Sequence, residues 1–136
     1  RSGYYYSFLF YYLCKMDTIF IAGNVPSSKN GKRWTGKYLI HSKTVMRYIK
    51  ESKEDYLDNR DKFIEMIEGK DLPLDISFKF IRNSRRKFDY INPAQTVQDL
   101  MVKYDYIQDD NCTCIIPHFE RYEYNKENSG VIIKIL

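Results

Sequence analysis

Residues 74–111 read LDISFKFIRNSRRKFDYINPAQTVQDLMVKYDYIQDDN, and they hold the clearest strand pattern and the most charged motif of the chain. In residues 74–81, apolar Leu, Ile and Phe alternate with Asp, Ser and Lys, which is the period of a strand with one buried face. A basic run follows, then Asp89, then a segment with helical spacing. The stretch therefore predicts a strand, a charged connection and a helix in direct succession.

The predicted helix begins near Asn92 and Pro93, a pair typical of an N-cap followed by proline at the first helical position. Four apolar residues recur on one face, which we expect to be the core side: Val97, Leu100, Met101 and Tyr104. The polar residues near the opposite face are Asn92, Gln95, Asp99 and Lys103. The helix is thus expected to present one apolar and one polar side.

Carboxylates flank this helix on both sides. Asp89 precedes its start, Asp99 lies on its polar side, and Asp109 and Asp110 follow a short turn after its end. If that turn folds back, carboxylates from three segments converge. Such oxygens can hold Mg²⁺, which neutralises a phosphodiester and orients the attacking water. Aspartates are also common in turns and caps, so a capping or solvated-loop role stays open from these residues alone.

Two basic segments would suit a polyanionic ligand, one directly before Asp89 and one in residues 24–37, a turn-rich loop around Trp34. The candidate nucleic-acid ligands are Lys29, Asn30, Lys32, Arg33, Arg85, Arg86 and Lys87. Cations interleaved with an aromatic ring suit phosphate neutralisation and stacking on a base or sugar. A solvated loop with Trp34 at the edge of the core is the alternative for residues 24–37.

The other predicted elements complete a small domain. Strands are expected at residues 17–23, 38–41, 112–119 and 131–136, the third broken by Pro117, with polar turns at 120–130. A helix, or a pair of helices broken near residues 58–59, is expected after the N-cap candidate Ser42 and is ended by Gly69 and Pro73. Residues 1–15 are expected to be an aromatic extension outside the domain of residues 16–136, with a strand or anchoring segment as the alternative.

Composition favours a small globular domain in a reducing compartment. The 136 residues suffice for one core, and the net charge of +4 matters less than the clustering of the basic residues. An odd count of three cysteines argues against a disulfide scaffold. Cys112 and Cys114 are expected on one face of a strand rather than as half of a metal site, because His41 and His118 are isolated in the sequence.

Taken together, these features resemble the RusA family of Holliday-junction resolvases of bacteria and their phages. The segment VPSSKN, residues 25–30, is similar to the family's Pro-Pro-Ser-x-Asn signature after the first strand. The basic run before Asp89, then Asn92, the helix with Asp99, and finally Asp109 and Asp110 follow the family's spacing. The resemblance covers residues 16–136.

The resemblance implies an α+β fold, with a small mixed sheet packed with two main helices, and a homodimer. It implies a Mg²⁺-dependent endodeoxyribonuclease, with Mn²⁺ as a substitute ion, that cuts four-way junctions in branched double-stranded DNA during recombination and repair. The implied setting is the cytoplasm of a bacterium or of a phage-infected bacterium, with no membrane partner. By position, the catalytic residues would be Asp89, Asp99 and Asp110, and the metal ligands Asp89, Asp109 and Asp110.

Two positions depart from the family pattern. Ile91 stands where the family has the second Asp of Asp-x-Asp-Asn, and Gln95 stands where it has a helix lysine. Losing a carboxylate weakens metal affinity, and losing a lysine removes a positive charge that could stabilise the transition state. Three hypotheses follow: a divergent enzyme, a junction-binding protein that no longer cuts, and a small interaction domain whose motif is fortuitous.

Overall fold

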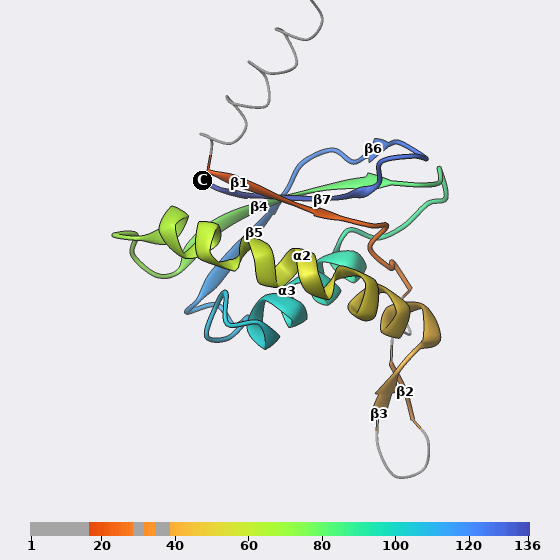
Figure 1. Ribbon diagram of the computed structural model, residues 1–136, viewed down its shortest axis with the longest axis horizontal. Coiled ribbons are helices and arrows are strands. Elements are labelled where there is room, and N and C mark those ends of the chain that lie inside the picture. The colour runs from red at the N-terminus through yellow and green to blue at the C-terminus, as the bar shows by residue number, and fades with distance from the viewer. Residues whose placement is uncertain (1–16, 29–31, 35–38) are drawn as a thin grey trace, which may run out of the picture.

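The computed structural model describes residues 17–28, 32–34 and 39–136. Within these residues, five strands form one mixed sheet, and helices α2 (Lys43–Ile67) and α3 (Ile91–Lys103) both lie on one face of it (Figure 1). The core lies between this sheet face and the helices. The predicted α+β class, a small mixed sheet packed with two main helices, is confirmed.

The sheet has the order β1-β7-β4-β5, and β6 also pairs with β4. Its strands are β1 (Thr18–Ala22), β4 (Leu74–Arg82), β5 (Ile115–Phe119), β6 (Glu123–Tyr124) and β7 (Gly130–Ile135). β7 pairs antiparallel with both β1 and β4, whereas β5 and β6 run parallel to β4. β4 therefore lies between antiparallel and parallel neighbours, and its alternating apolar side chains are buried as expected.

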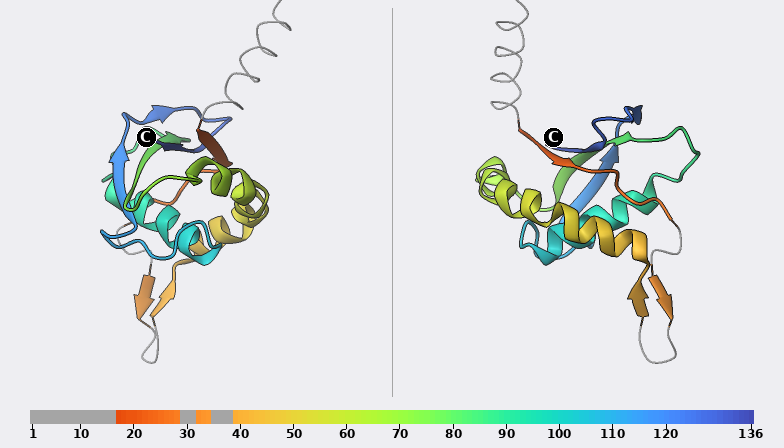
Figure 2. Two further views of the ribbon diagram at one scale, coloured as in Figure 1. Left: turned by 90° about the vertical axis from the view of Figure 1, so that its left-hand side faces the viewer. Right: turned by 45° about the vertical axis from the view of Figure 1, so that its right-hand side comes forward.

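A separate two-stranded sheet is formed by β2 (Lys32–Trp34) and β3 (Leu39–His41). The two strands project away from the main sheet and the helices in all views (Figures 1 and 2). β3 confirms the short strand expected at residues 38–41. The expectation of a loop throughout residues 24–37 is wrong at β2, because residues 32–34 pair with β3 in an antiparallel register.

Helix α2 is a single helix. The Ser42 side chain caps its start by accepting a hydrogen bond of 3.4 Å from a backbone N–H in the first turn, as predicted. The alternative with a break near residues 58–59 is wrong, because Tyr56 and Phe63 are fully buried on the same face and carry the core contact across that point. The helix ends just before Gly69, whose φ of +76° suits a residue without a side chain. No helix in the described part of the chain has the length and apolar character needed to cross a membrane.

Helix α3 starts earlier than expected. Its N-cap is Tyr90, which makes no capping hydrogen bond through its side chain, and Asn92 is the second helical residue rather than the cap. Pro93 is buried as the third helical residue. Proline is tolerated there because the first four N–H groups of a helix have no partner within it. The predicted core face is buried at Val97, Leu100 and Met101.

The strand expected at residues 112–119 is shorter, and Pro117 does not break it. Residues 112–114 form a turn, and β5 runs through Pro117, which is opposite Ile76 of β4. The Cys114 carbonyl accepts from the Leu74 N–H, and the Glu120 N–H donates to the Phe78 carbonyl. The backbone N–H and C=O groups of the even-numbered residues between them therefore point toward β4. Pro117 therefore lies with its missing N–H at the outer side of the strand, where no pairing is lost. The two cysteines are thus not strand neighbours; Cys112 is exposed and Cys114 is buried.

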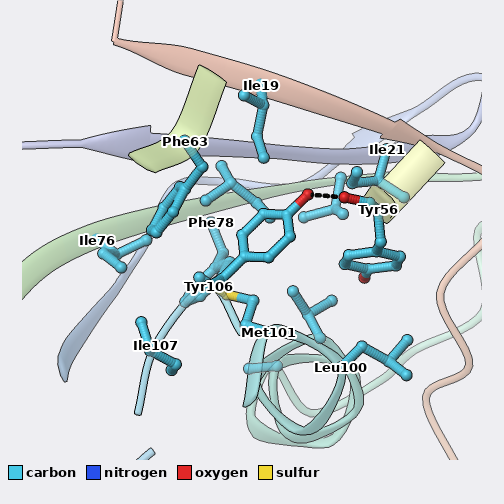
Figure 3. Close-up of a cluster of buried hydrophobic side chains, with 14 of the residues drawn as sticks. Ile19, Ile21, Tyr56, Phe63, Ile76, Phe78, Leu100, Met101, Tyr106 and Ile107 are labelled. Atoms are coloured by element: carbon cyan, nitrogen blue, oxygen red, sulfur yellow. Dashed lines mark hydrogen bonds between the residues drawn. The ribbon is translucent and has the colours of Figure 1, made fainter. Parts of the chain in front are cut away.

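Hydrogen-bonded tyrosines join α2 to the segment that follows α3 inside the core (Figure 3). The Tyr106 hydroxyl donates to the backbone carbonyl of Tyr56, and its ring lies 4.9 Å from that of Phe63. The hydroxyls of Tyr56 and Tyr48 lie 3.1 Å apart. The Ser52 hydroxyl donates to the Tyr48 carbonyl at 2.6 Å. These bonds satisfy polar groups that would otherwise be costly to bury.

We expect the tyrosine network to make the fold sensitive to alkali. Burial raises the pKa of Tyr48 from 10.0 to about 12 and that of Tyr56 well above its usual value. The unfolded chain ionises near pH 10 and the folded chain does not, so this stability is complete below pH 10 and falls as pH rises toward 12. In that window, each such tyrosine should lower the free energy of unfolding by about 1.4 kcal/mol per pH unit. Urea unfolding from pH 8 to 11 measures the slope, and Tyr48→Phe should reduce it by one tyrosine's share; an unchanged slope would contradict this role.

Candidate functional site

The chain reverses direction immediately after α3. Asp105 adopts a left-handed conformation with φ of 60°, and its N–H donates to the carbonyl of Val102 at 3.1 Å. The N–H of Tyr106 donates to the carbonyl of Met101 at 2.8 Å. This pair of hydrogen bonds is the Schellman arrangement that ends many helices, here with Asp in place of the usual Gly. The reversal sends residues 106–111 back along α3, as the sequence predicted.

The reversal places Asp110 beside two polar residues of α3. The Gln95 Nε2 donates to Asp99 Oδ1 at 2.8 Å and to Asp110 Oδ2 at 3.2 Å. Gln95 and Asp99 are one helical turn apart, so both side chains lie on the same face of α3. Carboxylate oxygens from a helix and from the following loop therefore converge on a single nitrogen atom. Two of the predicted catalytic residues, Asp99 and Asp110, are brought together in this way.

The neighbouring Asp109 has a different local role. Its Oδ1 accepts from the backbone N–H of Asp110 at 2.8 Å, and its Oδ2 accepts from the side-chain amide of Asn111 at 3.0 Å. The Asn111 side-chain oxygen in turn accepts from the Thr113 N–H at 2.9 Å. Both carboxylate oxygens of Asp109 thus take part in shaping the turn that leads toward β5. This geometry makes Asp109 a support for Asp110.

Asp89 and Ile91 lie at the beginning of α3. The side chain of Asp89 is exposed, and the backbone carbonyl of Asp89 accepts from the backbone N–H of Asn92 at 3.0 Å. Ile91, where the resolvase pattern has an aspartate, is 68% exposed, so the core does not require an apolar residue there. In the described part of the chain, no three His, Cys, Asp or Glu side chains are gathered to hold a metal ion. Asp99 and Asp110 are therefore brought together through Gln95, but the described residues do not form the expected group of three carboxylates.

The basic run before Asp89 lies on the surface. Arg85, Arg86 and Lys87 are all exposed. The Arg85 guanidinium lies 4.1 Å from the centre of the Tyr124 ring, a cation–π contact that restricts its side chain. The Arg86 N–H donates to the Ser84 hydroxyl at 3.4 Å. The run thus offers three exposed cations near the N-terminal end of α3, one of them held against an aromatic ring of β6.

A buried arginine ties this run to the loop after β1. The Arg82 guanidinium donates to the Val25 carbonyl, and to the Ser27 hydroxyl at 2.8 Å. It also lies 4.6 Å from the centre of the Phe88 ring. These partners are uncharged, and burial lowers the pKa of Arg82. Arg82 and Val25 are 57 residues apart in the sequence, so no local pattern predicts their contact.

Aromatic side chains hold the segment between β4 and α3 in place. The ring of Phe88 lies 5.1 Å from that of Tyr90 and 5.2 Å from that of Tyr122. Tyr90 also stacks on Phe119 of β5 at 5.6 Å, and its hydroxyl accepts from the Tyr122 N–H at 2.9 Å. The residues on both sides of Asp89 are therefore fixed against β5 and the connection to β6.

The second predicted basic segment is described in part. Lys29 and Asn30 lie outside the described residues. Lys32 and Arg33 lie on β2, opposite His41 and Ile40 in the projecting hairpin. The loop between β1 and β2 is fixed at its start to the end of β4. Arg82 donates to Ser27, and the Asn24 side-chain oxygen accepts from the Asn83 N–H at 2.9 Å. Both basic segments thus leave the domain from one anchored region.

We expect Arg82 to be required for stability, unlike its exposed neighbours. Arg82→Met leaves the buried Val25 carbonyl and the Ser27 hydroxyl without their donor, so the free energy of unfolding should fall by about 2 kcal/mol. Arg86→Met makes the same chemical change at an exposed site and should alter it by less than about 0.5 kcal/mol. Urea denaturation of both variants measures the difference. Equal stability of the two variants would show that Arg82 does not anchor the loop.

Comparison with known proteins does not assign the chain to a family. No family model matches the sequence, and no curated protein matches it. Function is therefore inferred from the residues and their geometry.

Proposed function

We propose that this chain is a Mg²⁺-dependent endonuclease of the RusA type that cuts four-way junctions in DNA. The observation that carries the proposal is the convergence of Asp99 and Asp110 on the Gln95 amide nitrogen. Two carboxylates that share one donor are held closer than like charges would otherwise stay. Such a pair on the flank of a helix, with exposed cations at that helix's N-terminal end, suits an anionic substrate that reacts with the help of a cation.

The donor set fits a hard divalent ion. Asp99 and Asp110 are both partly exposed, so two oxygens and water can share a coordination sphere. Mg²⁺ is commonly held by one or two carboxylates and keeps several waters. When bound, the ion would supply charge neutralisation for the phosphodiester and activation of water. Asp99 and Asp110 would hold it, Asp109 would fix the loop that carries Asp110, and Asp89 would contribute from the N-terminal end of α3.

The basic residues would hold the DNA backbone. Arg85, Arg86 and Lys87 are exposed next to Asp89, and the β2–β3 hairpin carries Lys32 and Arg33. Contacts of this kind give affinity that falls steeply with salt and carries little sequence preference. The Arg82 anchor would keep the start of the loop after β1 next to the end of β4, where the basic run begins. A symmetric junction would be cut in pairs by a homodimer, in which each copy supplies one site.

A junction-binding protein without cleavage is the second candidate. It is favoured by the absence of a group of three His, Cys, Asp or Glu ligands among the described residues and by the exposed Ile91 in place of a carboxylate. Such a protein would retain the basic surface and show binding that is lost at high salt. It would show no cutting with either Mg²⁺ or Mn²⁺.

The two functions separate in one cleavage assay. A synthetic four-way junction and a linear duplex of the same sequence are incubated with the protein and Mg²⁺. The enzyme reading predicts symmetric nicks in the junction alone, and Asp110→Asn should slow them about a hundredfold or more because a cation ligand is lost. Asp17→Asn changes an exposed carboxylate directly before β1, at the opposite edge of the sheet from β5, and should leave the rate unchanged. Salt-sensitive junction binding with no cutting in Mg²⁺ or Mn²⁺ would reject the enzyme and support the binding protein.

Restoring a carboxylate at position 91 tests whether the isoleucine found there, in place of the aspartate of the resolvase pattern, weakens the proposed site. Ile91→Asp should fold normally because Ile91 is 68% exposed, and a negative charge in the first turn of α3 is favourable. We expect stronger Mg²⁺ dependence and faster junction cutting than in the parent chain. Ile91→Asn, which adds polarity without charge, is the matched control and should give a smaller gain. If neither variant changes cutting or cation affinity, position 91 does not contribute to the site.

A further inference from the structure

We propose that Gln95 is a positioning residue: its amide holds Asp99 and Asp110 together in the cation-free protein and presents its oxygen to a divalent cation when one binds. The inference rests on the proposed function and names how the same site is prepared. It concerns the residue at which the chain departs from the resolvase pattern, where a lysine is expected.

The orientation of the amide follows from its partners. A carboxylate accepts hydrogen bonds and donates none, so the end of Gln95 that faces Asp99 Oδ1 and Asp110 Oδ2 must be the NH₂ group. The two N–H bonds of that group serve one carboxylate each. A single neutral side chain therefore links a helix residue to a residue 15 positions away in the following loop.

The contact is not a general property of glutamines on α3. Gln98, three residues further on, donates to the Ala94 carbonyl of its own helix at 3.2 Å. Gln98 is thus satisfied by the helix backbone, whereas Gln95 makes both of its described hydrogen bonds to carboxylates. Gln95 is also exposed, so these bonds are not needed to satisfy a buried group. Their consequence is to fix the position of Asp110 relative to Asp99.

The same side chain can serve two states because an amide has a donor at one end and an acceptor at the other. With no cation present, the NH₂ end offsets the repulsion between the two carboxylates. A divalent cation between the carboxylates would be repelled by the partial positive charge of the Gln95 NH₂ group. Rotation about the last side-chain bond of Gln95 would turn the amide oxygen toward the cation in place of the NH₂ group. Gln95 would then add a third oxygen to the two carboxylates without adding charge.

The test measures cation binding and the Gln95 amide itself. Mn²⁺ titration by calorimetry gives the dissociation constant for the parent chain and its variants. Gln95→Met keeps the length of the side chain and removes both amide atoms, so Mn²⁺ should bind about tenfold more weakly. Gln95→Glu retains an oxygen and adds charge, so Mn²⁺ should bind more tightly than in the parent chain. Gln98→Met makes the matched change on the same helix and should leave affinity unchanged.

A second readout follows the side-chain NH₂ resonances of Gln95 by ¹⁵N NMR, with Mg²⁺ as the diamagnetic ion. In the cation-free protein, Asp99→Asn or Asp110→Asn should shift these resonances because each removes an acceptor. In the parent chain, Mg²⁺ should shift them along a single saturable curve. The Gln98 NH₂ resonances should stay in place in both experiments.

The outcomes separate the inference from the function on which it rests. Weaker Mn²⁺ binding in Gln95→Met, together with a shift of the Gln95 resonances by Mg²⁺, supports the positioning role. Unchanged affinity in Gln95→Met overturns that role, while loss of binding in Asp99→Asn and Asp110→Asn would leave the proposed metal site standing. If the parent chain binds neither Mn²⁺ nor Mg²⁺ at millimolar concentration, both the positioning role and the metal-dependent enzyme are rejected.

Discussion

The parallel pairing of β4 with β5 is the constraint on which the rest of the structure depends. Two parallel neighbours cannot be joined by a tight turn, so the chain must cross from the end of one strand to the beginning of the other. Helix α3 makes that crossing with 13 residues. One end of the helix therefore follows the charged connection after β4, and the other must reverse toward β5. The reversal at Asp105 is the step that returns Asp110 to the flank of the helix.

Features that depend on the repeat of apolar residues along one element, or on a partner a few residues away, were predictable from the sequence. β4 and the core face of α3 were identified because their apolar residues repeat at the spacing of a strand and of a helix, and both faces are buried. The cap at Ser42 was identified because a serine hydroxyl directly before a helix has a local partner. The fold-back of Asp110 was expected from the short connection after α3. These features share a short range: the residues that decide them lie within one element or its immediate neighbour.

Features that depend on contacts between remote segments, or on which side of a strand faces its neighbour, were not predictable in the same way. Pro117 was expected to break a strand, since the sequence does not state which side of β5 faces β4. Asn92 was expected to cap α3, but the helix begins two residues earlier, next to the aromatic contacts of Tyr90. The role of Arg82 required knowledge of the loop after β1. In each case the local preference was real, and a contact between remote segments outweighed it.

The acidic site shows why a departure from a family pattern is best judged by its contacts. A lysine at position 95 would bring a full positive charge to Asp99 and Asp110 and would compete with a divalent ion for them. The glutamine makes two hydrogen bonds to the same oxygens without neutralising their charge. The two carboxylates are therefore held together without a positive charge beside them, as the proposed cation site would require, while the exposed Arg85, Arg86 and Lys87 lie separately, where the proposed DNA contacts would need them. Position 95 is one of the two departures from the resolvase pattern, together with Ile91, and in the structure its glutamine is the residue that joins the two carboxylates.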